Sequence, residues 1–118
     1  MAQQVAGVMC FSADMPATAS TVTLTIPVGW VVLEVLANIE VVLGGTDTVT
    51  VGYTGAVAAF MGDVDMGSGA VGMYLASEGA AASANGRKLG VGESVLITRV
   101  GSTSGGGEVY VWAAEVVP

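Results

Sequence analysis

The segment from Thr21 to Val51 constrains the fold of this chain more than any other. It opens with threonines alternating with valine, leucine and isoleucine, turns at Pro27-Val28-Gly29, and continues in a long apolar run from Trp30 to Leu43. A Gly-Gly-Thr-Asp turn at 44–47 leads into a second Thr/Val alternation. Alternating runs separated by glycine-rich breaks are typical of half-buried strands joined by turns. The segment is therefore predicted to be a β-meander.

Shorter runs of the same character occupy the rest of the chain. The expected strands are Val5–Phe11, Thr21–Ile26, Trp30–Leu43, Thr48–Tyr53, Ala56–Met61, Val71–Leu75, Ser94–Val100 and Glu108–Val117. Asn85-Gly86 adds a hairpin signal, and GSTSGGG at 101–107 is expected to be a loop. Several short strands with turns about every 8–12 residues predict an all-β chain, a single-domain antiparallel β-sandwich or jelly-roll-like barrel. Residues 21–118 would form this domain, and residues 1–20 an N-terminal arm or its first strand.

The long run from Trp30 to Leu43 has two different faces if it alternates strictly. Its odd positions are purely apolar, whereas its even positions mix Val32, Leu36 and Val42 with polar residues. Leucine and glutamate also suit a helix, but the density of valine and isoleucine favours a strand. The apolar face is expected to cover the core, and the mixed face to be partly covered by a neighbour.

The composition leaves more apolar surface than a small domain can hide. Of the 118 residues, 53% are hydrophobic and 11% charged, against roughly a quarter charged in an ordinary soluble domain. Because a small domain has a high ratio of surface to volume, another copy or another protein is expected to cover the surplus.

Charge excludes several classes of function. Ten acids against three basic residues give a net charge of −7, the wrong sign for binding nucleic acid through its phosphates. The apolar window Ile26–Leu43 contains two glutamates, an asparagine and a proline, which argues against a membrane span. The N-terminus lacks the basic region of a secretory signal, and a lone Cys10 cannot form an internal disulfide, so folding in a reducing compartment is expected.

The sequence has almost no material for catalysis, and no catalytic, cofactor-binding or metal site is expected. It contains no histidine, the commonest general base. Residues 67–72 match G-x-G-x-x-G, but no β-α-β context surrounds them. Asp63 and Asp65 resemble the start of a calcium loop whose twelfth position is Tyr74, not the glutamate that the loop requires. Both matches are interpreted as glycine-rich or acidic loops.

Four stretches together resemble a known group of proteins. TLTIPVGWVVLEV, a Gly-Gly turn, TVTVGYTGAVAAFMG and GESVLITRVGSTSGGGEVYVWAAEV are similar to small β-sandwich structural proteins of tailed phages. That group includes capsid decoration (cement) proteins, head fibres and tail-associated domains. The resemblance covers about residues 21–117. It implies a virion structural protein on the capsid surface, made in the host cytoplasm, that binds the major capsid protein and itself as a homo-oligomer such as a trimer.

Two other functions stay open. A tail or fibre component would use the same fold, and a carbohydrate-binding jelly roll would stack sugars on exposed aromatic rings. If the chain is a decoration protein, subunit contacts are expected from the N-terminal segment, the mixed face of the long strand and the only basic dipeptide. These candidate residues are Val5, Val8, Phe11, Val32, Leu36, Val42, Arg87 and Lys88.

Overall fold

A computed structural model describes residues 4–78 and 94–117, and this part of the chain contains eight strands. The strands are β1 (Gln4–Asp14), β2 (Ser20–Leu24), β3 (Val31–Val41), β4 (Thr48–Tyr53), β5 (Ala56–Met61), β6 (Gly72–Leu75), β7 (Val95–Val100) and β8 (Gly106–Val117). Two short 3-10 turns, η1 (Val64–Gly69) and η2 (Ala76–Glu78), flank β6. Every strand predicted from the sequence is present, with shifts at the ends, so the prediction of an all-β fold is confirmed.

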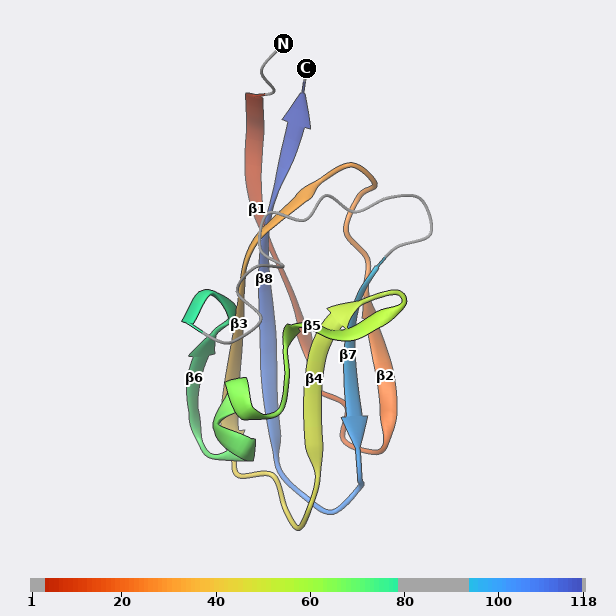
Figure 1. Cartoon of the computed structure of the whole chain (residues 1–118), viewed down its shortest axis with the longest axis vertical. Helices are drawn as coiled ribbons and strands as arrows, with labels where there is room; N and C mark the ends of the chain where they lie inside the picture. Colours follow the sequence, from red (N-terminus) through yellow and green to blue (C-terminus); the bar gives the residue numbers. More distant parts are fainter. Residues whose placement is uncertain (1–3, 79–93, 118) are drawn as a thin grey trace.

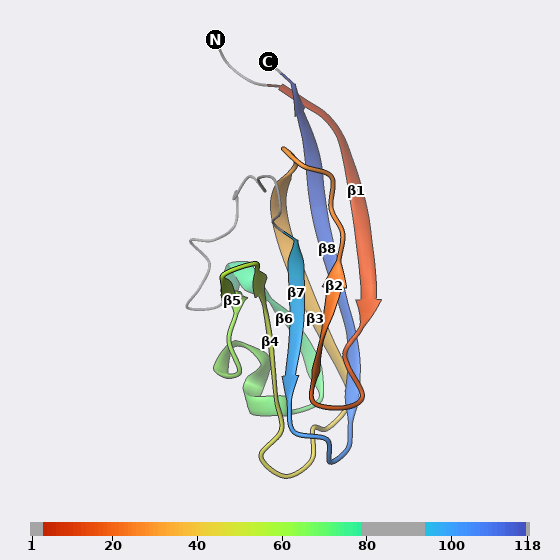
Figure 2. The same ribbon diagram turned by 90° about the vertical axis from the view of Figure 1, so that its right-hand side faces the viewer.

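The strands form two antiparallel four-stranded sheets with the connectivity of a jelly roll. Sheet A has the order β1-β8-β3-β6 and sheet B the order β2-β7-β4-β5. The first strand pairs with the last, the second with the seventh, the third with the sixth and the fourth with the fifth, as if one long hairpin had been rolled up. Figures 1 and 2 show the two layers, with both described chain ends at one end of the molecule.

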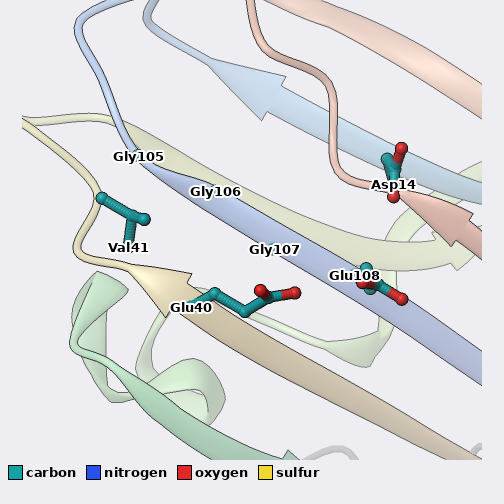
Figure 3. A pocket seen from close by; sticks show the side chains of 7 residues that line it. All are labelled: Asp14, Glu40, Val41, Gly105, Gly106, Gly107 and Glu108. Carbon is teal, nitrogen blue, oxygen red and sulfur yellow. The ribbon is translucent and has the colours of Figure 1, made fainter.

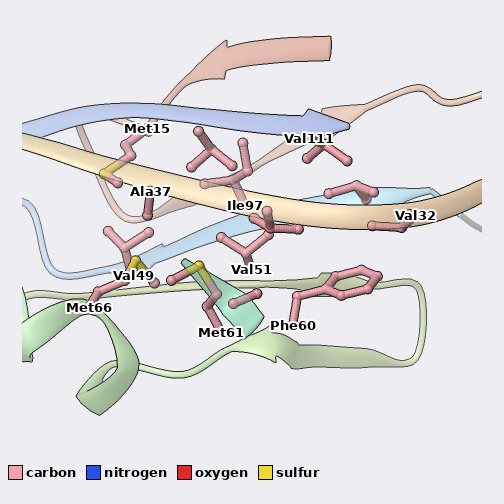
Figure 4. Packing of buried hydrophobic residues seen from close by; sticks show 14 of the residues in the cluster. Met15, Val32, Ala37, Val49, Val51, Phe60, Met61, Met66, Ile97 and Val111 are labelled. Carbon is pink, nitrogen blue, oxygen red and sulfur yellow. The ribbon is translucent and has the colours of Figure 1, made fainter. Parts of the chain in front are cut away.

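The core lies between the sheets and is built from the inward positions of both (Figure 4). Val49 and Val51 of β4 and Ile97 of β7 are at most 1% exposed and face Val111 of sheet A. Phe60 closes one side of this cluster. Side chains on alternate positions of a strand share one face, which is why the Thr/Val alternation of β4 buries its valines.

Strand β3 differs from the strict alternation expected for it. Val32 is fully buried, whereas Leu33 is 40% exposed and Val41 is 59% exposed. The pairing with β8 shifts register between Val32 and Glu34 and again between Ile39 and Val41, and each extra residue turns the following side chains over. The assignment of Val32 to the mixed, partner-facing side was therefore wrong: it belongs to the core of its own chain.

Residues 4–14, for which the sequence allowed an arm or a first strand, form β1 at one edge of sheet A. The strand pairs with β8 along its whole length. Its second half packs on the body, where the ring of Phe11 meets Trp30 edge-on at 6.0 Å. Its first half runs beside the end of β8 past the other strands (Figure 1), and there Val8 and Met9 are 55% and 53% exposed. We call residues 4–9 of β1 and residues 113–117 of β8, with which they pair, the ribbon.

At the opposite end of the molecule, one buried arginine joins three loops. Arg99 of β7 forms an ion pair with Asp47, Nη2 to Oδ2 at 2.7 Å, with both side chains at most 3% exposed. Its guanidinium also donates to the carbonyl oxygens of Pro16, Ser104 and Gly105 at 2.6–3.0 Å. Asp47 accepts two further bonds, from the amide and the hydroxyl of Thr103. The loops β1–β2, β3–β4 and β7–β8 are thus held by one charged group.

The tight approach of β8 to β3 gives a first test of this structure. A Cβ at Gly107 would lie 1.8 Å from the backbone oxygen of Asn38, whereas a Cβ at Gly7 would meet nothing within 4 Å. Gly107→Ala is therefore expected to lower the free energy of unfolding by about 1–3 kcal/mol, as overpacking does. Gly7→Ala, the matched control, is expected to change it by no more than about 0.5 kcal/mol. Urea denaturation of both variants measures the difference, and equal values would contradict the register of β8.

Candidate functional site

The outer surface of sheet A is the most distinctive surface of the described structure. Val109, Val111 and Ala113 of β8 are buried, so the residues that alternate with them point away from the core. In Figure 2 sheet A forms an outermost layer, with no described element beyond it. We call this surface the outer face. Its members are Cys10, Ser12 and Asp14 of β1, Glu108, Tyr110 and Trp112 of β8, Glu34, Leu36, Asn38 and Glu40 of β3, and Met73 and Leu75 of β6.

Two aromatic rings run down the middle of the outer face. The rings of Tyr110 and Trp112 have centroids 6.3 Å apart and planes inclined by 31°, and both side chains are half-buried. The Tyr110 hydroxyl donates a hydrogen bond to Oε2 of Glu108. This hydrogen bond to Glu108, and after it burial, raises the pKa of the Tyr110 hydroxyl. One column of side chains along β8 therefore contains two aromatic rings, those of Trp112 and Tyr110, followed by the carboxylate of Glu108.

Three carboxylates from three strands meet at the lower end of this column. Asp14 lies opposite Glu108 in the β1–β8 pairing, and Glu40 reaches in from β3 beside the backbone of 105–107 (Figure 3). Together they line an open hollow of about 370 Å³. A hydrogen bond to Glu108 and repulsion from its charge raise the pKa of Glu40. The hollow therefore concentrates negative charge, and no basic side chain from residues 4–78 or 94–117 is paired with it.

The walls of the hollow limit what it can hold. It is lined by glycine backbone, Val41 and carboxylates, not by the largely apolar, enclosing walls usual around a small organic ligand. Within residues 4–78 and 94–117, no three or more His, Cys, Asp or Glu side chains are placed to hold a metal ion. The described helical turns are also too short to cross a membrane. The arrangement suits a contact surface better than a pocket.

The pKa values of Asp47 and Glu40 are shifted in opposite directions, so the two carboxyl groups have opposite effects on how stability depends on pH. Arg99 and then the amide of Thr103 lower the pKa of Asp47, so its contribution is lost as pH falls below about 3.9. The pKa of Glu40 is raised instead, so stability increases as pH falls from neutral towards about 4.3. We expect the Tm to be highest in mild acid. Glu40→Gln should flatten only the limb above about pH 4.3, and an unchanged limb would contradict the repulsion in the hollow.

The candidate contact residues from the sequence lie in different places. Val8 is exposed on the ribbon, and Val42 is 56% exposed beyond the end of β3. Leu36 is half-buried on the outer face, and Phe11 packs against the body. Val5 lies in β1 opposite Val116. Arg87, Lys88 and the Asn85-Gly86 hairpin signal lie outside the described residues.

The two loop motifs have structural explanations. Gly67 has a φ of 61° and passes so close to the ring of Tyr74 that a Cβ there would lie 2.5 Å from its hydroxyl. The Tyr74 hydroxyl donates to the carbonyl of Ala70 at 2.8 Å. The carboxylate of Asp65 accepts from the amide of Gly62 at 2.8 Å. These residues build a turn around a tyrosine, with no strand–helix unit for a nucleotide.

Sequence interpretation missed the outer-face column. Trp112 is half-buried on the outer face, and Cys10 beside it on β1 is exposed. A signal was present: in the run EVYVWAA at 108–114, Glu, Tyr and Trp alternate with Val, Val and Ala. Strict alternation separates these two sets onto opposite faces.

Comparison with known proteins gives one informative likeness. No protein-family model and no curated protein matches the chain. A chain in the solved structure titled "Cyanophage Pam1 capsid asymmetric unit" is similar, with a TM-score of 0.62 and 22% sequence identity. The likeness covers 95% of this chain and 84% of that chain. At this identity it shows that the two chains share a fold.

Proposed function

We propose that this chain is a structural protein of a tailed-phage virion, and specifically a capsid decoration (cement) protein. In this role it sits on the capsid surface, binds the major capsid protein and associates with itself, for example as a trimer. The observation that carries the proposal is the fold shared, over 95% of the chain, with a chain of a cyanophage capsid asymmetric unit. Jelly rolls also occur in lectins, so the fold needs support from the surface.

The exposed side chains supply that support. Among the residues that the structure describes, ten large hydrophobic side chains are at least 40% exposed, in a chain with few charges to solvate them. They are Val8, Met9, Val28, Leu33, Val41, Val42, Val57, Val71, Met73 and Val100. Exposed apolar groups gathered into patches mark protein interfaces. A cement protein works by burying such groups between capsid subunits, and it needs no catalytic residue.

The exposed groups suggest two contact regions at opposite ends of the molecule. Val8 and Met9 lie on the ribbon, and Val41 and Val42 lie near the loops that Arg99 joins. Two separated apolar regions suit a protein that must touch itself and a second protein at once. We assign the ribbon to contacts between copies of the chain and the opposite end to the capsid.

An electron cryo-microscopy map of the intact virion tests the proposal. Density that fits this jelly roll on the outside of the head, repeated around a symmetry axis of the capsid, is expected. Density in the tail or in a fibre would instead favour the alternative virion role. A virion without density for this chain would reject both.

A further inference from the structure

We propose that the outer face of sheet A is a docking surface for an arginine-bearing segment of a partner protein. The inference deepens the proposed function, because it states the chemistry that the partner must present. It rests on that function only for the partner's identity as a capsid protein. The evidence for the surface itself comes from charge, aromatic placement and exposure.

The first step is a charge imbalance on this face. Asp14, Glu40 and Glu108 converge at the hollow from three strands (Figure 3). The one basic side chain in residues 4–78 and 94–117 is Arg99, which is fully buried and paired with Asp47. No described cation therefore faces the three carboxylates, and each would gain from a cation supplied by a partner.

The second step is the position of the aromatic rings relative to these charges. Alternate residues on a strand are about 7 Å apart, so the ring of Tyr110 separates Trp112 from Glu108 along one column. A guanidinium group stacks on aromatic faces and donates paired hydrogen bonds to carboxylates. An ammonium group offers neither the flat stacking surface nor the paired donors. The order of side chains along the strand, two aromatic rings followed by a carboxylate, therefore favours arginine over lysine as the side chain that the partner presents.

The third step argues against the outer face of a second copy as the occupant. A second outer face would bring the same three carboxylates into the contact, and like charges brought together across an interface cost several kcal/mol. A purely apolar partner would leave the carboxylates buried without counter-charges, which is costly as well. A basic segment avoids both penalties. The open form of the hollow also admits a side chain that enters from a partner.

Binding of an octa-arginine peptide to the full chain tests the inference. Glu108→Gln removes one charge from the outer face, and Glu115→Gln removes the same charge from the same strand at a position of opposite alternation. By fluorescence titration at physiological salt, Glu108→Gln should weaken binding about tenfold, and Glu115→Gln less than twofold. Octa-lysine should bind the unaltered protein more weakly than octa-arginine. Equal effects of the two substitutions would overturn the proposal, since net charge alone would then explain the attraction.

A glycan array gives a second, independent readout. Tyr110 and Trp112 could stack sugars in place of guanidinium groups, so glycans bound by the unaltered protein and lost in Trp112→Leu would also overturn the proposal. Absence of such glycans, together with the peptide result, supports it. Neither assay requires a virion, so failure of the docking proposal can be distinguished from failure of the cement role, which the particle map decides.

Discussion

Replacement of Arg99 by methionine is expected to lower the free energy of unfolding by about 3–5 kcal/mol, because removing one partner of a buried ion pair leaves the other charge uncompensated. Methionine keeps a long unbranched side chain, so the loss comes from the guanidinium. Four bonds disappear at once: one to Asp47 and three to carbonyl oxygens of two loops. For a domain of this size the Tm should fall by roughly 10–20 °C.

Urea denaturation at a fixed protein concentration measures this loss. Thr98→Ala is a suitable control, because it alters the preceding residue of β7 and removes only an exposed hydroxyl contact with Thr21 at 3.2 Å. It should cost no more than about 1 kcal/mol. Adding Asp47→Asn to the Arg99→Met variant should recover part of the loss, since the orphaned charge is then gone. A double variant less stable than Arg99→Met would mean that the carboxylate is not the source of the cost.

The sequence predicted the strands well because their signal is local. The predicted bounds of β4 and β5 match the observed ones. β4 alternates from Thr48 to Val51, and β5, whose periodicity is weak, lies between Gly55 and Gly62. The order of strands in the sheets depends on contacts between distant segments, and alternation does not specify which strand pairs with which. The sequence therefore left a sandwich and a jelly roll as alternatives, and the pairing of the first strand with the last resolved them.

The candidate site was less predictable for two physical reasons. Asp14, Glu40 and Glu108 come from three strands far apart in sequence, and only the β1-β8-β3 order makes them neighbours. Bulges in β3 also reversed the expected face of Val32, and a bulge leaves no clear mark in a run composed almost entirely of apolar residues. The column of Tyr110 and Trp112 could have been recognised from alternation alone.

The burial of Arg99 could have been predicted from the sequence, but its partner could not. Val95, Ile97 and Arg99 alternate in β7, so the same face that buries two apolar residues also buries Arg99. A charge at such a position requires a partner. That partner, Asp47, lies in a turn 52 residues away, and no local sequence pattern connects the two residues.

Truncation of the N-terminus is expected to separate assembly from folding. Deleting residues 1–8 removes the projecting half of β1 and leaves Met9 as the new first residue. Ala114 of β8 stays paired with Val31 of β3, so the free energy of unfolding should change by no more than about 1 kcal/mol, as for a fraying strand end. The shortened chain should nevertheless lose self-association, because the ribbon carries exposed apolar groups but little of the core.

Deleting residues 1–12 gives the matched comparison. This longer deletion also removes Phe11, whose ring packs on Trp30, and it uncovers the edge of β8 at Val111, which is fully buried. A further loss of about 2–3 kcal/mol is expected from the missing aromatic contact and the exposed core. Sedimentation velocity and urea denaturation on both truncations measure the two effects separately. Unaltered self-association after deletion of residues 1–8 would remove the ribbon from the interface, and unfolding of that shorter truncation would place the whole of β1 in the cooperative core.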